Sequence, residues 1–336
     1  MKYIPNILTV TRILFIPFYI LPFIYNDIYG SNSLIYGFII FVLLSLSDFL
    51  DGYLARKFDI VSNFGKIVDP LADKLLVYSA FFLLVYLKRF PVWIILILLL
   101  REILVTIHRD AAKSEGVAIA AVMSGKIKTT VQMITIIVGF INHIFSDILG
   151  RLDYYLIFAA LIITIYSGID YYLKNKVKVS TVAFINKIYI YFLSIFRLGK
   201  IPFAPGTIGS MSAVIVYILF NKFFSGLGLY NIFWLIPLFV IGSILSDKSY
   251  LLFNENDSSE IIIDEFIGQF IPLIFIQNPS FINILVVFII FRIFDILKPY
   301  PISAIDRMDN GWGVMLDDII AGGVTLGILQ IFILLT

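Results

Sequence analysis

Long apolar runs, separated by short polar segments, dominate the first half of the chain. Examples lie at residues 13–25, 34–46, 90–100, 134–144 and 156–165, and with their flanks several approach the roughly 20 residues that a helix needs to cross a bilayer. The apolarity is continuous rather than alternating, which favours helices over the strands of a barrel. Because backbone amides in lipid must be paired within the protein, we expect an all-α polytopic membrane protein.

Six membrane-spanning helices are predicted in the first half. They cover about residues 7–27, 34–55, 68–87, 91–110, 125–145 and 152–173. One side of these spans receives Lys2, Arg56, Lys57, Lys66, Arg109, Lys113, Lys126, Lys174, Lys176 and Lys178. The other side receives Lys88, Arg89 and Arg151. Since cytoplasmic loops carry an excess of Lys and Arg, the N-terminus is predicted to be cytoplasmic.

The composition also favours a bilayer. Of the 336 residues 60% are hydrophobic and 14% are charged, whereas about 25% are charged in a soluble domain. The net charge of +2 is too small to indicate a nucleic-acid partner, and the lack of cysteine excludes disulfides and thiolate chemistry. Arg12 lies inside what would be the core of a signal peptide and no small-residue cleavage site follows, so we expect this segment to be retained.

A polar segment predicts a domain boundary near Val179. Three lysines between residues 174 and 178 precede a shorter amphipathic run, which is typical of a linker with a helix at the membrane interface. We therefore predict a first domain at 1–178, a linker at 179–196 and a second, smaller helical membrane domain at 197–336.

Several aspartates lie at the predicted cytoplasmic helix ends, in DFLDGYLARKFDIVSNFGKIVDPLADK at residues 48–74. Helical spacing puts Asp48 and Asp51 on one face of the second helix, and Asp69 and Asp73 on one face of the third. Ionised carboxylates that lie close together repel one another, so the cluster needs bound cations. Oxygen ligands select Mg²⁺, Mn²⁺ or Ca²⁺, and the sequence therefore predicts a divalent-metal site.

Small residues lie on the same helix faces as these acids. Gly52 and Ala55 accompany the first pair, and Gly65 accompanies the second pair, so a large phosphorylated group could approach the backbone. Arg56 would then contact its phosphates.

A structural role is the alternative explanation for Asp69. Pro70 follows it, as proline does at the first position of a helix, so Asp69 could be a helix cap. Asp48 and Asp51 are not explained in this way, because they close a helix, where the dipole disfavours anions.

The acids and small residues together read Asp48-x2-Asp51-Gly52-x2-Ala55-Arg56-x8-Gly65-x3-Asp69-x3-Asp73. This pattern resembles the full signature of the CDP-alcohol phosphatidyltransferases. Within that family, IPNILTVTR (4–12), LREILVTIHRDAA (100–112) and GKIKTTVQM (125–133) resemble segments of the bacterial phosphatidylglycerophosphate synthases. The resemblance covers about residues 1–175.

This resemblance implies a six-helix membrane enzyme with two divalent ions, Mg²⁺ or Mn²⁺, held by Asp48, Asp51, Asp69 and Asp73. Asp73 would also be the general base that takes the proton from the primary hydroxyl of glycerol 3-phosphate. That hydroxyl would attack the phosphatidyl phosphorus of CDP-diacylglycerol, and CMP would leave. Paired metals suit such a transfer because they neutralise the negative charge that spreads over the phosphoryl group.

The phosphate of the acceptor requires cations of its own. Arg109, Lys126 and Lys128 are the candidates, with Arg101 behind them. Any one of these side chains could instead extend to the membrane surface.

Three polar islands interrupt the apolar runs of the second half, at residues 197–210, 258–269 and 291–323. They contain Asp264, Glu265, Arg292, Asp295, Lys298, Asp306, Arg307, Asp317 and Asp318. The first island, RLGKIPFAPGTIGS, suits a loop whose amides could cradle an anion. Both histidines lie in the first half and cysteine is absent, so a phosphatase in the second half would use metal-activated water or an aspartate.

The islands resemble phosphatidylglycerophosphatase A through PFAPGTIGS, IIIDEFIGQ, FRIFDILKPYPI and GVMLDDIIAGG, over about residues 195–336. DNGWG, around Gly311, departs from the usual double glycine. The resemblance implies Mg²⁺-dependent removal of the terminal phosphate from phosphatidylglycerophosphate, with at least one ion.

Several residues of this half are candidates for that chemistry. The metal-binding or catalytic acids would be Asp264, Glu265, Asp295, Asp317 and Asp318, and Arg292 and Lys298 would contact phosphate. Adjacent residues of a helix do not face one point, so either Asp317 or Asp318 could instead cap the final helix.

The two halves together predict a bifunctional enzyme of phosphatidylglycerol synthesis in the bacterial cytoplasmic membrane, with both sites facing the cytoplasm. Three alternatives stay open: a transporter with buried carboxylates, a phosphatidyltransferase for serine, inositol or phosphatidylglycerol, and a non-catalytic second half. The predicted partners are CDP-diacylglycerol, glycerol 3-phosphate, phosphatidylglycerophosphate and membrane lipids, without nucleic acid. The sequence leaves open whether the chain forms a homodimer.

Overall fold

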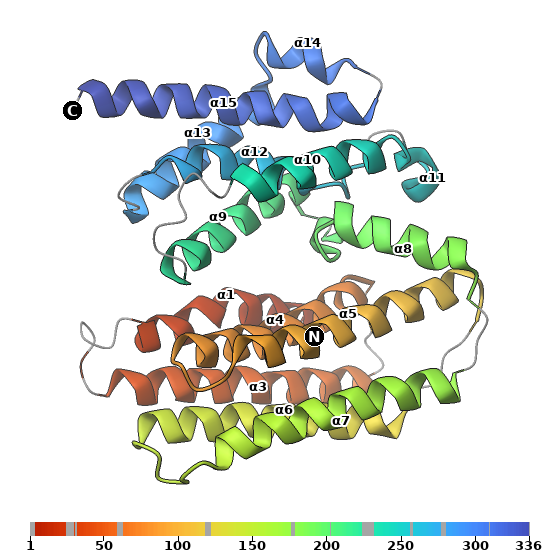
Figure 1. Ribbon diagram of the computed structural model, residues 1–336, viewed down its shortest axis with the longest axis vertical. Helices are drawn as coiled ribbons and strands as arrows, with labels where there is room; N and C mark the ends of the chain where they lie inside the picture. The colour runs from red at the N-terminus through yellow and green to blue at the C-terminus, as the bar shows by residue number, and fades with distance from the viewer. Residues whose placement is uncertain are drawn as a thin grey trace. The chain divides into compact units, whose positions relative to one another are not determined.

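The computed structural model describes residues 4–24, 30, 32–58, 63–117, 122–175, 179–201, 203–223, 232–255, 258–276, 280–308 and 310–335. The regular structure in these residues is helical throughout, as Figure 1 shows, so the expected all-α class is confirmed. The chain divides into two compact units, which we call unit 1 (Met1–Phe184) and unit 2 (Ile185–Thr336).

Unit 1 contains a helix for each of the six predicted spans. These are α1 (Ile4–Ile24), α3 (Ser33–Phe58), α4 (Asn63–Tyr86), α5 (Val92–Ser114), α6 (Met123–Ile144) and α7 (Leu152–Lys174). Among the described residues of the chain, three helical segments are long and apolar enough to cross a membrane: Met123–Ile144, Leu152–Lys174 and Gly311–Ile331. These apolar helices indicate a multi-pass membrane protein.

Large buried side chains hold the helices of unit 1 together. Tyr19, Phe41, Phe81 and Phe140 are almost entirely inaccessible to solvent, and the rings of Phe41 and Phe140 pack edge to face at 5.3 Å. Helices α1 and α3 approach closely at Gly37, where a Cβ atom would lie 2.9 Å from the carbonyl oxygen of Tyr19. This core fixes α1 and α4 against each other, and both of these helices contribute to the first site described below.

Helix α8 (Thr181–Leu193) spans the boundary between the two units. Its N-terminal half exposes Val182, whereas Ile190 and Leu193 near its C-terminal end are buried, and Leu193 belongs to the core of unit 2. The predicted boundaries at residues 178 and 196 and the interfacial position of this helix remain predictions.

Unit 2 is built around the short helix α12 (Ile263–Ile274). The other elements are η1 (Leu198–Lys200), α9 (Pro205–Phe223), α10 (Ile232–Ser246), α11 (Ser249–Phe253), α13 (Phe281–Leu297), α14 (Ile302–Asp306) and α15 (Gly311–Leu335). Helices α9, α10, α13 and α15 all contact α12. Because α12 has 12 residues, it is too short to cross a bilayer.

Glycines allow α12 and α15 to pack at very short range. A Cβ atom on Gly268 would lie 2.5 Å from the carbonyl oxygen of Asp318, and one on Gly322 would lie 2.3 Å from that of Gly268. The side chains at the N-terminal end of α12 therefore lie next to the acids of α15.

The first polar island of the second half is not entirely a loop, contrary to the sequence-based prediction. Residues 205–210 form the first turns of α9, with Pro205 as the first helical residue. Proline is favoured there because its fixed φ suits the helix and its missing N–H would have no partner. The island presents a helix N-terminus instead of an extended loop.

Candidate active sites

In unit 1, polar contacts between side chains join α1 to α4. Thr9 Oγ1 donates a hydrogen bond to Asp69 Oδ1 at 2.5 Å, and Arg12 Nη1 contacts Asp73 Oδ1 at 2.6 Å. Both contacts can form together because Thr9 and Arg12 are three residues apart on α1, and Asp69 and Asp73 are four residues apart on α4, so each pair lies on one face of its helix. Asp69 and Asp73 thus lie on one face of α4.

Thr9 and Arg12 were not predicted as site residues. Both are fully buried, whereas the side chain of Asp73 is 45% exposed. A fully buried arginine needs a charged partner, so an arginine inside the apolar run of α1 was the signal available in the sequence.

The remaining predicted ligands in the first half are only partly described. Asp48, Asp51, Gly52, Ala55 and Arg56 belong to α3, but their side chains lie outside the described residues. Gly65 is buried near the start of α4. The convergence of four aspartates on one metal site therefore remains a prediction.

A separate cavity of about 220 Å³ in unit 1 brings the predicted phosphate ligands together. Arg101, Arg109, Lys126 and Lys128 all line it, from α5 and α6. Arg109 and Lys126 are exposed, and the Arg109 guanidinium lies 5.9 Å from the centre of the Tyr171 ring. Their position at one cavity agrees with the predicted anion site, although the role of each remains a prediction.

One acid, Glu102, lies among these cations and was not predicted. Its Oε2 atom accepts a hydrogen bond from Lys128 Nζ and lies 3.4 Å from Arg101 Nη1. Arg101 Nη2 also donates to Ser167 Oγ of α7 at 3.0 Å. Lys128 is 6% exposed, so its charge depends on the carboxylate beside it.

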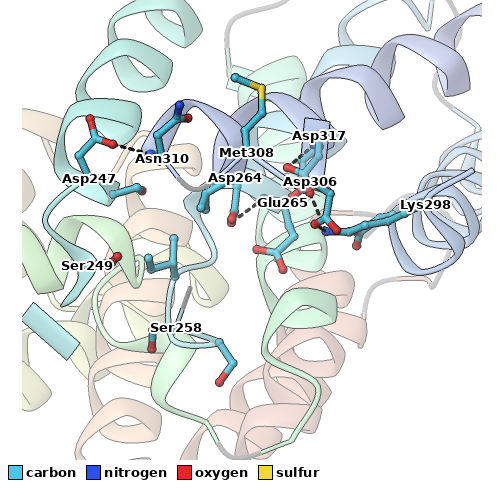
Figure 2. A pocket seen from close by; sticks show the side chains of 17 residues that line it. Asp247, Ser249, Ser258, Asp264, Glu265, Lys298, Asp306, Met308, Asn310 and Asp317 are labelled. Carbon is cyan, nitrogen blue, oxygen red and sulfur yellow. Dashed lines mark hydrogen bonds and ion pairs between the residues drawn. The ribbon is translucent and has the colours of Figure 1, made fainter. Parts of the chain in front are cut away.

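Unit 2 contains a larger polar cavity of about 450 Å³ (Figure 2). Its lining includes all five predicted acids of the second half and Lys298. These acids are Asp264, Glu265, Asp295, Asp317 and Asp318. In Figure 2 the labelled acids Glu265, Asp306 and Asp317 lie near Lys298, Asp264 lies beside Glu265, and Asp247 lies apart from them.

Three of the acids could hold a cation. Asp264, Glu265 and Asp318 each offer a carboxylate oxygen, and these oxygens lie within 4.8 Å of one another. Glu265 Oε2 and Asp318 Oδ1 are buried without a hydrogen-bond partner in the described part of the chain. Buried, unpaired carboxylate oxygens at this separation fit a hard divalent cation, which takes oxygen ligands.

Burial and mutual repulsion raise the pKa values of the two acids on α12, Asp264 and Glu265. The pKa of Glu265 is raised to about 8: burial is the largest cause, the hydrogen bond with Asp264 opposes it, and the charge of Asp318 adds to the rise. The pKa of Asp264 also lies well above its usual value, first because of burial and then because of the charge on Glu265. A divalent cation would relieve both causes, since it replaces protons as the counter-charge.

The adjacent acids of α15 have different partners, and neither of them caps the helix. Because α15 begins at Gly311, Asp317 and Asp318 lie inside it, and the capping alternative was wrong. Asp318 belongs to the three-acid group, whereas Asp317 Oδ2 accepts a hydrogen bond from Lys298 Nζ at 2.6 Å. Lys298 also pairs with Asp306 of α14, which was not proposed as a site residue.

Arg292 lies beside this cavity on α13. Its Nη1 atom pairs with Asp295 and contacts Ser210 Oγ of α9 at 3.4 Å. A Cβ atom on Gly206 would lie 2.3 Å from Glu265 Oε1 and 3.1 Å from Arg292 Nη1. The glycine therefore lets the N-terminus of α9, where backbone N–H groups favour anions, lie directly against the acidic group and the guanidinium.

Comparison with known proteins gives a separate result for each half. Residues 2–166 match the family model for CDP-alcohol phosphatidyltransferase, and residues 191–333 match that for phosphatidylglycerophosphatase A. The chain is 36% identical over 182 residues to CDP-diacylglycerol–glycerol-3-phosphate 3-phosphatidyltransferase of Bacillus subtilis (strain 168), covering 51% of this chain and 94% of that protein.

Two further relatives, one for each half, agree with this division. A probable phosphatidylglycerophosphate synthase of Mycobacterium tuberculosis is 36% identical over 166 residues, covering 49% of this chain and 78% of that protein. Phosphatidylglycerophosphatase A of Haemophilus influenzae is 39% identical over 127 residues, covering 38% of this chain and 77% of that protein. The chain therefore belongs to the CDP-alcohol phosphatidyltransferase family through its first half and to the phosphatidylglycerophosphatase A family through its second half.

Proposed function

We propose that the chain makes phosphatidylglycerol in two steps, one in each unit. The first step transfers phosphatidyl from CDP-diacylglycerol to glycerol 3-phosphate, and the second removes the terminal phosphate of the product. The observation that carries this proposal is that each unit has its own polar cavity, cationic in unit 1 and acidic in unit 2. The names of the relatives of each half support the same two activities.

In the transfer step, Asp48, Asp51, Asp69 and Asp73 would hold two Mg²⁺ or Mn²⁺ ions. Gly52, Ala55, Arg56 and Gly65 would receive the CDP-diacylglycerol phosphates. Asp73 accepts the proton of the primary hydroxyl of glycerol 3-phosphate. The hydroxyl oxygen then forms a bond to the phosphatidyl phosphorus, and the bond from phosphorus to CMP breaks.

The cationic cavity of unit 1 would receive the phosphate of glycerol 3-phosphate. Arg101, Arg109, Lys126 and Lys128 give it a positive lining, and Tyr171 lies at the same cavity. Glu102 balances only part of the charge of these four cations, and an acceptor such as inositol brings no anionic group to the rest, which favours glycerol 3-phosphate over that alternative.

In the hydrolysis step, Asp264, Glu265 and Asp318 would hold at least one divalent ion, and Asp295 and Asp317 lie in the same cavity. Lys298 and Arg292 would contact the terminal phosphate. A water molecule adds to the phosphorus, and the bond from phosphorus to the glycerol oxygen breaks, which gives phosphatidylglycerol and inorganic phosphate. Bound ions in both units would neutralise the negative charge that develops on the phosphoryl oxygens.

We also propose that the protein lies in the cytoplasmic membrane of a bacterium, with both sites on the cytoplasmic side. The distribution of Lys and Arg between the six predicted spans of the first half supports this orientation for the first site. Joining the two activities in one chain would raise the local concentration of the intermediate near the second site.

A time course with purified protein tests the proposal. The protein receives CDP-diacylglycerol, labelled glycerol 3-phosphate and Mg²⁺, and CMP, lipid products and inorganic phosphate are followed. We expect CMP first, phosphate later, and neither of them after complete chelation of divalent ions. Release of CMP without phosphate would contradict the phosphatase activity proposed for unit 2. A lack of CMP release would contradict the transferase activity proposed for unit 1.

A further inference from the structure

Glu102 is the one acid beside four cations among the described residues that line the cavity of unit 1. A carboxylate is unexpected in a pocket for an anion, because it repels a phosphate and reduces the positive charge of the lining. Its contacts suggest a reason, since they involve the two least exposed of these cations, Lys128 and Arg101.

The same carboxylate oxygen joins side chains of two helices. Glu102 Oε2, on α5, accepts from Lys128 Nζ of α6 and lies 3.4 Å from Arg101 Nη1. Ser167 of α7 holds the other arm of the Arg101 guanidinium, at 3.0 Å. Without the carboxylate, two cations would face each other in a poorly solvated place, and Lys128 would turn away or lose its proton.

The backbone of Glu102 is also connected to α4. Thr106 Oγ1 donates to the Glu102 carbonyl oxygen at 2.7 Å and accepts from Lys74 Nζ at 2.8 Å. Lys74 directly follows Asp73, the proposed base. Glu102 is therefore linked through Thr106 to α4, and it lines the same cavity as the exposed cations Arg109 and Lys126.

We infer that Glu102 is a positioning residue that holds the Lys128 ammonium and the Arg101 guanidinium in place for the phosphate of the acceptor. This inference rests on the proposed transfer to glycerol 3-phosphate. Each cation keeps N–H donors beyond those bonded to Glu102, since an ammonium has three and a guanidinium five. Glu102 acts through these cations and not on the reacting atoms, so it governs acceptor binding.

Glu102→Gln tests this inference, because the amide keeps the size of the side chain but loses its charge. We expect the KM for glycerol 3-phosphate to rise roughly tenfold, with the KM for CDP-diacylglycerol and kcat changed less than about twofold. Glu102→Asp should restore part of the acceptor affinity. In a Lys128→Met background, Glu102→Gln should raise the KM for glycerol 3-phosphate by clearly less than tenfold, since one of the two cations that Glu102 holds is gone and only Arg101 remains.

Glu115→Gln is the matched control, because Glu115 directly follows α5 and is exposed. Hydrolysis of added phosphatidylglycerophosphate checks the amount of intact protein in each preparation, and an unchanged KM for CDP-diacylglycerol shows that unit 1 is folded. An unchanged KM for glycerol 3-phosphate in Glu102→Gln would overturn the inference, as would an equal loss in kcat and in CDP-diacylglycerol affinity. Failure of the wild-type protein to use glycerol 3-phosphate would instead overturn the proposed function.

Discussion

At the scale of single residues, both units place buried charged side chains next to other charged groups. Arg12 in unit 1 is fully buried and contacts Asp73, and Lys128 depends on Glu102. In unit 2 the carboxylates of Asp264, Glu265 and Asp318 lie close together. Glu265 Oε2 and Asp318 Oδ1 are buried there without a hydrogen-bond partner among the described residues. The first arrangement is balanced by side chains, and the second is one that protons or a divalent cation from outside the chain would balance.

Replacement of Arg12 tests the balance in unit 1. A hydrogen bond to a charged group contributes about 1.5–3 kcal/mol, so Arg12→Gln should lower kcat for CMP release by at least roughly tenfold. Arg12→Lys should lose less, because it keeps the charge. Arg151→Gln, at the N-terminal end of α7, is the control. Full CMP release by the Arg12→Gln protein would contradict a role for this contact in orienting Asp73.

The acids of unit 2 predict a pH dependence. The folded-state pKa of Glu265 is about 8, above the 4.5 of an ordinary glutamate. The folded protein without metal therefore binds more protons than the unfolded chain, and its stability falls as the pH rises from about 4.5 towards 8. Thermal unfolding of the metal-free protein should occur at lower temperature at pH 8 than at pH 6.

Metal binding follows the opposite trend, because protons compete with the ion for the same oxygens. The Mg²⁺ concentration that gives half-maximal hydrolysis of phosphatidylglycerophosphate should fall between pH 6.5 and 8.5, by up to about tenfold per pH unit for each proton displaced. A half-maximal concentration independent of pH would show that these acids do not bind the ion.

At the scale of elements, the position of the acidic group depends on the close packing of α12 against α15. Adjacent glycines of α15 provide a matched pair, since a Cβ atom on Gly322 would lie 2.3 Å from the Gly268 carbonyl oxygen and one on Gly323 would contact nothing within 4 Å. The first glycine sets the distance between the helices, and the second does not.

Gly322→Ala should therefore push α15 away from α12 and separate Asp318 from Asp264 and Glu265. Forcing an extra carbon into a packed contact costs about 1–3 kcal/mol, and the phosphatase activity should fall at least roughly tenfold. Gly323→Ala should be neutral or slightly stabilising, because alanine is the better helix former. Equal phosphatase activity and equal unfolding temperatures in the two variants would contradict this packing role.

At the scale of the whole molecule, helices were predictable from the sequence and most cross-helix partners were not. The lengths of the apolar runs predicted six helices in unit 1. Helix α4 begins at Asn63, before the predicted start at residue 68, because its first turns are polar and the prediction followed apolar residues. The helix at 205–210 was missed, since Gly, Pro and Thr also suit a loop.

The predicted acids of unit 2 and the predicted cations of unit 1 lie at two cavities, because helical spacing and polar islands restrict where they can be. The partners of Asp69, Asp73 and Lys128 in unit 1 were not predictable. They are Thr9, Arg12 and Glu102, and these contacts join helices at residues 26 to 61 positions apart in sequence, which no local pattern specifies. Asp306 was also missed, although it is only eight residues from Lys298, since its pairing follows from the turn that leads into α14.

Asp318→Asn tests the central claim, that two separate sites act in sequence, most directly. The variant receives CDP-diacylglycerol, glycerol 3-phosphate and Mg²⁺, and CMP and inorganic phosphate are measured together. We predict CMP release at the wild-type rate, with phosphate release reduced by roughly two orders of magnitude, or about 2.7 kcal/mol in activation free energy, and accumulation of phosphatidylglycerophosphate. Phosphate release at the wild-type rate, or loss of CMP release together with phosphate release, would contradict the account.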